Sequence, residues 1–365
     1  MHPHAFAAVS VLVASTGCWA SHGSDTDQVT DAPDVLADES ATDTIDEGCI
    51  PNCAGHECGP DPVCGTSCGV CRPGWECAES GACRDRCRES YCDQVLVPAG
   101  PFVMGSDDDN DIILPPWITH TQPLFEEMPE HIVILSTFWI DRYEVTTERY
   151  WACVGAGECR APIYPEASDR AYLHHPISVA WDDAVVYCAW IGRRLPTEAE
   201  WEKAARGGCE LGGDPSRCDD PEDERQWPWG WEIPDCSKAN IVVGPGGEST
   251  SCAVGGRADT MPVGSYPAGR SPYGVEDMTG NVWEWVADWF GYYDDFGCAT
   301  GCTNPVGPAS GDNHVMRGCY FTCDQGDESN VIWSRVTGRI PVYYWPGLPP
   351  VDYTGDGFRC ASDGE

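Results

Sequence analysis

Cysteine is the residue type whose number and spacing offer the most chemistry in this sequence. The 365 residues include 23 cysteines, whose thiols could bind zinc, hold an iron–sulfur cluster or pair as disulfides. Zinc ribbons need paired Cys-x2-Cys knuckles, and only Cys68 and Cys71 have that spacing. The cysteine count, together with 40 glycines and 30 prolines, favours a loop-rich protein held by disulfides in an oxidising compartment.

The N-terminus has a pattern typical of export. Residues 5–14 form a short apolar run, and the small residues at 15–17 precede Cys18. This arrangement resembles a bacterial lipoprotein cleavage site, so we predict a signal peptide over 1–18 and a lipid on Cys18. An ordinary signal peptide with Cys18 discarded is the alternative. No later apolar run is long enough to span a bilayer, so we expect an outer-surface lipoprotein or a secreted protein.

Acidic residues greatly outnumber basic ones. The chain has 59 Asp and Glu against 21 Lys and Arg, a formal net charge of -38. Such a surface repels nucleic-acid phosphates and anionic lipid headgroups, which argues against both as partners, and it suits divalent cations.

Composition divides the rest of the chain into three segments. Residues 19–48 lack Lys and Arg and have few large apolar side chains, which predicts a disordered acidic linker. Residues 49–92 hold ten cysteines among Gly and Pro, which predicts a small disulfide-stapled module of undetermined pairing, either a binder or a spacer. Residues 93–365 hold the other twelve, an even number that allows this large domain to close all its own disulfides.

The large domain shows both strand and helix patterns. We predict two strands joined by a turn at 95–97 and 102–105, and a further apolar strand run over 132–140. Helices are predicted over 144–154, with Tyr150 and Trp151 inward, and over 181–190.

A third helix has an explicit start signal. Thr197 and Glu200 have the spacing of a capping box, in which each side chain binds the other residue's backbone N–H. A few helices, several short strands and long loops predict an α+β domain held by disulfides and ions.

Ordered motifs run through this domain. The most specific is Arg-Leu-Pro-Thr-Glu-Ala-Glu-Trp-Glu at 194–202. Others, in chain order, lie at 97–106, 141–146, 175–190, 227–230, 239–241, 280–285 and 357–360. Together they resemble the formylglycine-generating enzyme (sulfatase-modifying factor) family over about residues 95–362. The resemblance implies a C-type-lectin-like fold with little regular secondary structure, and 97–106 as its opening hairpin.

The resemblance also implies calcium. Its ligands would be Asp277, Gly280, Val282 and Glu284, two side chains and two backbone carbonyls on a tight loop, which suit a hard cation. The alternative is a glycine turn with a helix-capping acid.

A second calcium site would use Asn240 and Ile241. Its other ligands would come from the region before Pro262, where residues 255–257 read Gly-Gly-Arg and carry no acidic pattern.

The family's reaction is a copper-assisted oxidation by dioxygen of a substrate cysteine to formylglycine. Two cysteines five residues apart hold copper(I), a soft ion that favours two thiolates. Aligned on Gly318, Cys323 takes the first position, and the second holds Glu328, a hard ligand.

Cys319 could supply the missing thiolate only if the chain turns. An extended strand separates residues four apart by roughly 13 Å, whereas a turn can bring their Cα atoms to ~6 Å, close enough for one ion or one disulfide. Other cysteines also lie close together in the sequence and could pair across short loops. The resemblance to the family implies a long-range disulfide between Cys188 and Cys360. The remaining predicted pairs are Cys153–Cys159, Cys209–Cys218, Cys236–Cys252, Cys298–Cys302 and Cys319–Cys323.

The residues therefore support two functions. The first is an exported, calcium-stabilised binding domain without copper oxidase activity, with a peptide, protein or glycan in its groove. The aromatic run 343–346 could contact such a partner, although packing is its alternative role. The second is an active, copper-dependent oxidase that uses Cys319 and Cys323.

Overall fold

The computed structural model describes the large domain with gaps. Described are residues 75–77, 83–85, 94–107, 125–162, 172–212, 218, 224–244, 250–253, 255–256, 258–323, 328–341 and 356–364. Cys18, the acidic linker and the aromatic run 343–346 lie outside these residues. Of the cysteine-rich module, only an antiparallel pair of strands is described, β1 (Trp75–Cys77) and β2 (Cys83–Asp85).

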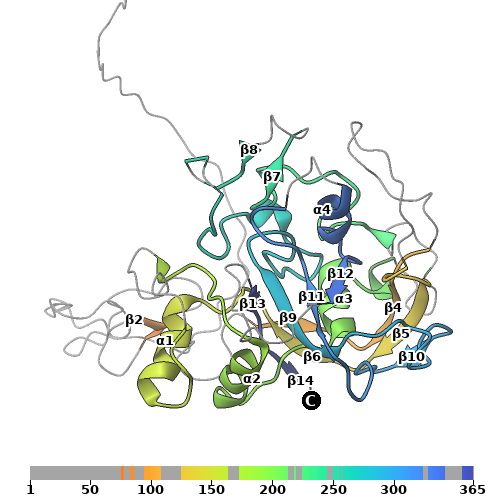
Figure 1. The fold of residues 1–365 in the computed structure, drawn as a ribbon, viewed down its shortest axis with the longest axis horizontal. Helices are drawn as coiled ribbons and strands as arrows, with labels where there is room; N and C mark the ends of the chain where they lie inside the picture. Colours follow the sequence, from red (N-terminus) through yellow and green to blue (C-terminus); the bar gives the residue numbers. More distant parts are fainter. Residues whose placement is uncertain are drawn as a thin grey trace, which may run out of the picture. The chain divides into compact units, whose positions relative to one another are not determined.

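Two three-stranded sheets form one bent ribbon. The first has the order β14-β6-β3, and the second has the order β10-β5-β4, the latter at the right of Figure 1. The strands are β3 (Gln94–Val97), β4 (Gly100–Met104), β5 (His131–Leu135), β6 (Phe138–Asp141), β10 (Cys302–Thr303) and β14 (Ala361–Asp363).

Within this ribbon, β3 and β4 do not pair with each other, so the predicted opening hairpin is wrong. Val97 pairs with Phe138 and Gly100 with Leu135, because the chain steps from one sheet to the other at 98–99. The paired segment passes from β5 to β6 at the same place, and there the Thr137 hydroxyl accepts a hydrogen bond from the Ala99 N–H. The predicted strand over 132–140 is therefore two strands.

A four-stranded sheet lies at the centre of Figure 1, in the order β12-β11-β9-β13. Its strands are β9 (Trp283–Trp289), β11 (His314–Arg317), β12 (Arg339–Pro341) and β13 (Asp356–Phe358). The β13 strand runs parallel to β9, which brings the C-terminal motif beside the 280–285 motif. The strands β7 (Val242–Val243) and β8 (Thr250–Ser251) form a separate two-stranded antiparallel sheet.

The predicted helix over 181–190 has the expected bounds, and the helix capped by Thr197 begins at Glu198. The helix predicted over 144–154 begins only at Thr147, because Thr146 is its N-cap. The helices are α1 (Thr147–Ala156), α2 (Trp181–Trp190), α3 (Glu198–Arg206) and α4 (Glu328–Trp333), with 3-10 turns at Cys209–Gly212 and Pro267–Gly269. The capping box of α3 is present, with both reciprocal hydrogen bonds. Tyr150 of α1 is fully buried as predicted, whereas Trp151 is only half-buried.

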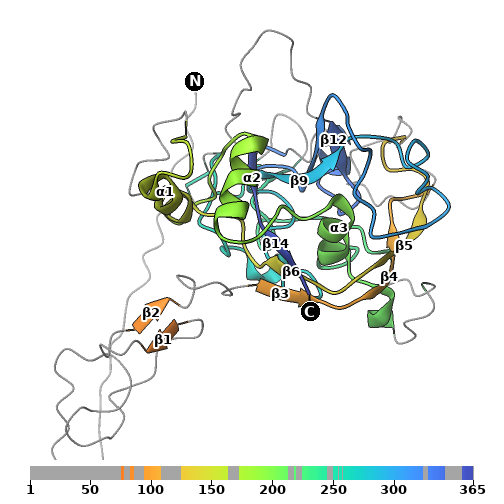
Figure 2. The same cartoon turned by 90° about the horizontal axis from the view of Figure 1, so that it is seen from below.

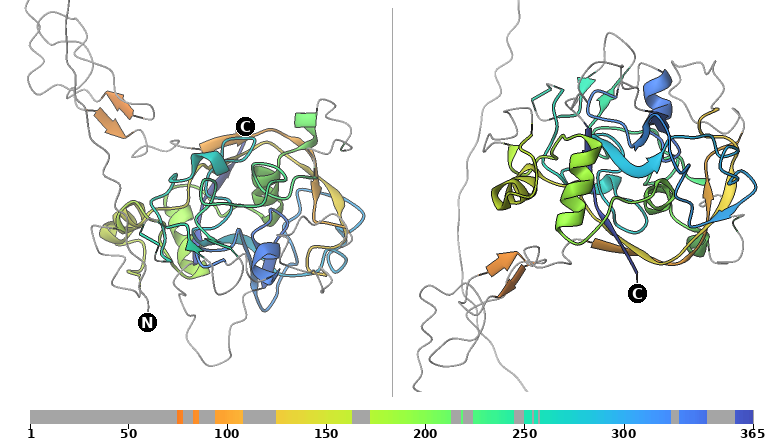
Figure 3. Two further views of the ribbon diagram at one scale, coloured as in Figure 1. Left: turned by 90° about the horizontal axis from the view of Figure 1, so that it is seen from above. Right: turned by 60° about the horizontal axis from the view of Figure 1, so that its bottom comes forward.

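Helices α2 and α3 pack against β9, and α1 packs against α2. Figure 2 shows α2, β9 and α3 side by side, and both panels of Figure 3 show α1 next to α2. Two clusters of buried apolar side chains result, one around Phe102 and Trp201 and the other around Tyr187 and Phe358. Among the described residues, no helix is both long and apolar enough to cross a bilayer.

Candidate functional site

Glu284 is held by the arginine that directly follows the neighbouring strand. Gly357 of β13 pairs with Glu284 of β9, and Arg359 comes directly after β13. Both Glu284 oxygens accept hydrogen bonds from the Arg359 guanidinium at 2.6 Å, and the Trp201 indole N–H donates to one of them at 2.9 Å. All three side chains are buried, so this carboxylate is fixed and its charge is paired.

Two further carboxylates close to Glu284 lack such pairing. Asp277, at a φ of 60°, accepts a backbone hydrogen bond from Gly264 N at 2.6 Å, and burial raises its pKa to about 6. Burial, together with the charges of Asp277 and Glu284, raises the pKa of Glu144 well above its usual range. One oxygen of Glu144 accepts from Asn281 Nδ2 at 2.8 Å, and the other is buried without a hydrogen-bond partner.

Three buried carboxylates thus face one buried guanidinium. A surplus of negative charge with an unpartnered oxygen is unfavourable in a protein interior unless a cation or protons compensate it. The donor set is all oxygen, the chemistry that calcium prefers. The predicted ligands Asp277 and Glu284 therefore fit a hard cation, and Glu144 is a third carboxylate close to them. The sequence contained Glu144 only as part of a motif, with nothing to indicate that it points at this loop.

Gly280 and Val282 lie on the same loop as predicted. Gly280 has a φ of 82°, and a Cβ on it would lie 2.4 Å from the Asn240 carbonyl oxygen, so only glycine fits. Val282 is fully buried. The loop is fixed by an isolated bridge between Asn240 and Gly280, which brings the two predicted calcium loops together.

The second predicted site is less complete. Asn240 donates hydrogen bonds to Asn281 Oδ1 and to the Asp259 carbonyl, and its own Oδ1 is buried without a partner. Ile241 is buried. The Asp259 carboxylate accepts hydrogen bonds from the Tyr172 hydroxyl and the Thr260 N–H. Each of its two oxygens therefore already accepts one hydrogen bond.

Cys319 and Cys323 are joined in a disulfide. Their sulfurs are 2.01 Å apart and their Cα atoms 6.0 Å apart, so the segment turns rather than extends. The turn is built by a hydrogen bond from Cys323 N to the Tyr320 carbonyl and by a φ of 62° at Cys319. Both cysteines are buried. Glu328 is described only as the first residue of α4.

Aromatic rings surround this turn. Tyr320 stacks on Trp283 with ring centroids 6.3 Å apart, and Trp333 meets the same indole edge-on at 6.3 Å. Phe321 packs against Tyr320 at 5.5 Å. Trp283 is buried, while the other three rings are half-buried. They form what we call the aromatic shelf: Tyr320, Phe321 and Trp333.

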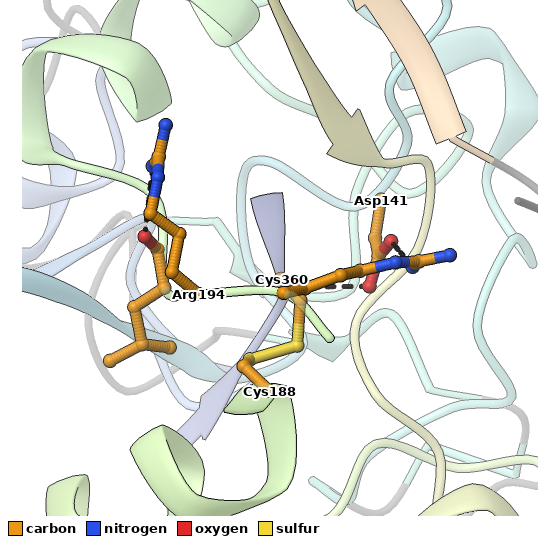
Figure 4. Close-up of a disulfide and its surroundings, with 6 residues drawn as sticks. Asp141, Cys188, Arg194 and Cys360 are labelled. Atoms are coloured by element: carbon orange, nitrogen blue, oxygen red, sulfur yellow. Dashed lines mark hydrogen bonds and ion pairs between the residues drawn. A yellow bond between two sulfur atoms is a disulfide. The ribbon is translucent and has the colours of Figure 1, made fainter. Parts of the chain in front are cut away.

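Five other disulfides lie in the described part of the chain. Cys188 of α2 bonds Cys360 across a sequence separation of 172, as Figure 4 shows. Asp141 lies on the other side of Cys360 and accepts its backbone N–H at 3.1 Å. The remaining four join Cys153–Cys159, Cys209–Cys218, Cys236–Cys252 and Cys298–Cys302.

Comparison with known proteins identifies this architecture. The sulfatase-modifying factor enzyme 1-like domain matches residues 79–363. The chain belongs to this family. The formylglycine-generating enzyme of Thermomonospora curvata is 31% identical over 316 residues, covering 74% of this chain and 93% of that enzyme. The resemblance and the α+β fold expected from it are thereby confirmed.

The family contains more than one activity. The hercynine oxygenase of Mycolicibacterium smegmatis is 32% identical over 263 residues, which covers 61% of this chain and 53% of that enzyme. The solved structure of PvdO from Pseudomonas aeruginosa is 27% identical, covers 74% of this chain and 94% of its own, and superposes with a TM-score of 0.49. Membership therefore fixes the fold, and the activity must be argued from this chain's own residues.

Proposed function

We propose that this protein is a member of the family that lacks copper oxidase activity and acts as an exported, calcium-stabilised binding domain. The observation that supports this is the Cys319–Cys323 disulfide. Copper(I) is held by thiolates, and the two sulfurs of a disulfide carry neither the negative charge nor the free valence of that ligand. With Glu328 at the position of the second copper cysteine, Cys323 has no other thiol partner nearby in sequence.

Calcium has a structural role in this proposal. Bound by Asp277 and Glu284, with Glu144 beside them, it would supply the positive charge that Asp277 and Glu144 lack. Arg359 orients Glu284 with two hydrogen bonds, while Gly280 lets the loop pass close to Asn240. Calcium would thereby fix the loop that precedes β9.

The aromatic shelf is the proposed contact surface for a peptide, protein or glycan. Half-buried rings present apolar faces at low conformational cost, because packing of Tyr320 and Trp333 against Trp283, and of Phe321 against Tyr320, already orders them. The shelf occupies the region in which the resemblance places the family's copper cysteines. An exported location, with a lipid on Cys18, would bring this surface to extracellular partners.

Loss of oxidase activity is tested directly. The purified protein is incubated with copper, dioxygen and a peptide that carries the sulfatase motif, and aldehyde formation is followed by mass spectrometry. The Thermomonospora curvata enzyme serves as the positive control. We expect no aldehyde from this protein and no free thiol at Cys319 or Cys323 under denaturing conditions. Aldehyde that disappears in the Cys323→Ala variant would establish the oxidase instead.

Calcium and partner binding are tested separately. Calcium should raise the melting temperature of the wild type but not of Asp277→Asn; equal shifts would refute the site. Peptide and glycan arrays are probed with the wild type, with a Tyr320→Ala/Phe321→Ala variant and with Val306→Ala, a control for an exposed apolar residue outside the shelf. Binding that is lost only in the shelf variant supports the proposal, and binding that all three share contradicts it.

A further inference from the structure

We propose that His131, Cys298 and Cys302 form a redox-gated metal site, closed as a disulfide and open, after reduction, to a d10 cation such as Zn²⁺ or Cu⁺. Their ligand atoms all lie within 4.8 Å of one another. Among the described residues, no other three His, Cys, Asp or Glu side chains bring their ligand atoms this close together. The site is independent of the proposed calcium and binding functions.

The fold brings the three residues together from distant parts of the chain. His131 begins β5, and Cys302 begins β10, which runs parallel to β5 with Cys302 opposite Val133. Cys298 lies at a turn closed by a hydrogen bond from Gly301 N to its carbonyl at 2.8 Å. Gly301 has a φ of 103°, and even a Cβ there would lie only 3.1 Å from the Ile132 carbonyl oxygen. The turn is therefore pressed against the strand that carries the histidine.

The histidine is oriented as a ligand. Nδ1 lies 2.8 Å from the Pro129 carbonyl, which can only accept, so Nδ1 carries the proton and Nε2 presents its lone pair. Nε2 is buried and has no hydrogen-bond partner, and the whole residue is 5% exposed. The ring packs against Tyr293 with centroids 4.5 Å apart. A metal-bound histidine commonly donates its other N–H to a carbonyl in this way.

The chemistry of the donor set selects the cation. Two thiolates and one imidazole suit Zn²⁺ or Cu⁺ rather than the hard calcium ion. A thiol reductant opens the site: attack on the half-buried Cys302 releases the Cys298 thiolate, and a second thiol releases Cys302. The two electrons come from the reductant, which leaves as its own disulfide. The cation then displaces the remaining thiol protons. Exchange with a small-molecule disulfide, which takes up the two electrons and leaves as two thiols, would re-form the Cys298–Cys302 bond and expel the cation.

The full-length protein offers a direct test. It is reduced anaerobically with a phosphine, which is then removed, and it is titrated with Co²⁺ as a spectroscopic substitute for Zn²⁺. Sulfur-to-cobalt charge-transfer bands report thiolate ligation and cannot arise from the carboxylate site. A parallel titration with Cu⁺ against a chromophoric copper(I) chelator distinguishes the two cations. Cys319→Ser/Cys323→Ser is the matched control, because that pair has the same spacing.

We expect charge-transfer bands in the reduced wild type and in the control, and none in the oxidised protein. The reduced Cys298→Ser/Cys302→Ser variant should bind one Co²⁺ fewer than the control. His131→Phe, which keeps a ring against Tyr293, should bind on the order of tenfold more weakly or worse. Unchanged affinity in His131→Phe, or equal binding by the oxidised protein, would overturn the site.

A measurement on the wild type alone guards against misfolded variants. Bound Zn²⁺ or Cu⁺ should slow the alkylation of Cys298 and Cys302 in the reduced protein, and it should leave the alkylation of Cys319 and Cys323 unchanged. Peptide mapping by mass spectrometry gives the rate at each cysteine. Equal rates with and without both metals would refute the proposal.

Discussion

The Cys188–Cys360 disulfide should contribute about 5 kcal/mol to the free energy of unfolding of the large domain. Its sequence separation is 172. Four shorter disulfides within this loop bypass the residues that they enclose, so the effective chain path is about 140 residues. Closing a loop of that length removes about 17 cal/mol/K of entropy from the unfolded chain, which corresponds to about 5 kcal/mol at 25 °C.

The double variant Cys188→Ala/Cys360→Ala tests this value against a matched control. Cys319→Ala/Cys323→Ala removes another pair of buried cysteines, but their separation is only 4, for which the same relation gives about 2 kcal/mol. Both variants leave small cavities of similar size, so the cavity costs should largely cancel in the comparison. The long-range variant should therefore be less stable than the control by about 3 kcal/mol.

Equilibrium unfolding in guanidinium chloride, monitored by tryptophan fluorescence, measures the difference. Both proteins should unfold with comparable denaturant dependence, and the midpoint of the long-range variant should lie clearly lower. Equal midpoints would refute the reasoning, because they would show that buried packing rather than loop closure determines what these bonds contribute.

Three further changes have definite expected results. Burial raises the pKa of Asp288 to about 8, so the folded state keeps a proton that the unfolded state releases near pH 4. The stability of the wild type should therefore fall by up to about 1.4 kcal/mol per pH unit between these two values. In thermal melts, Asp288→Asn should show a flatter pH dependence from pH 5 to 8 and a higher melting temperature than the wild type at pH 7. Glu202→Gln should cost about 3–5 kcal/mol in chemical denaturation because it removes a fully buried partner of Arg317, whereas Arg160→Gln in an exposed pair should cost under about 1 kcal/mol. Gly280→Ala should abolish the calcium-dependent rise in melting temperature, since its Cβ would lie 2.4 Å from a backbone carbonyl oxygen, and an unchanged rise would contradict this role of the loop.

Local signals predicted the helices well and the strand pairing poorly. The capping box at Thr197 acts within one helical turn, so four residues suffice to recognise it. The bend of the ribbon depends instead on the level at which two distant strands step between sheets, near Ala99 and Thr137. Neither segment contains that information alone, which is why the predicted hairpin joined strands that do not pair.

The same limit applied to the sites. Asp277 lies on the loop that leads into β9 and Glu284 lies at the start of that strand, so their spacing could be recognised in the sequence. Glu144 reaches them only through its hydrogen bond with Asn281, from a position 137 residues away. Glu144 therefore has no sequence spacing that links it to the calcium loop. In the structure it is identified by its buried carboxylate oxygen, which has no hydrogen-bond partner.

The two Cys-x3-Cys pairs show why spacing alone does not determine cysteine chemistry. Cys298–Cys302 and Cys319–Cys323 have the same sequence separation, and both are disulfides. The first pair faces the unpartnered Nε2 of His131, whereas the second lies among the rings of the aromatic shelf. Reduction of the first would complete a three-ligand site, while reduction of the second would produce two thiols without a described third donor. The neighbours supplied by distant strands therefore decide which pair can exchange a covalent bond for a metal ion.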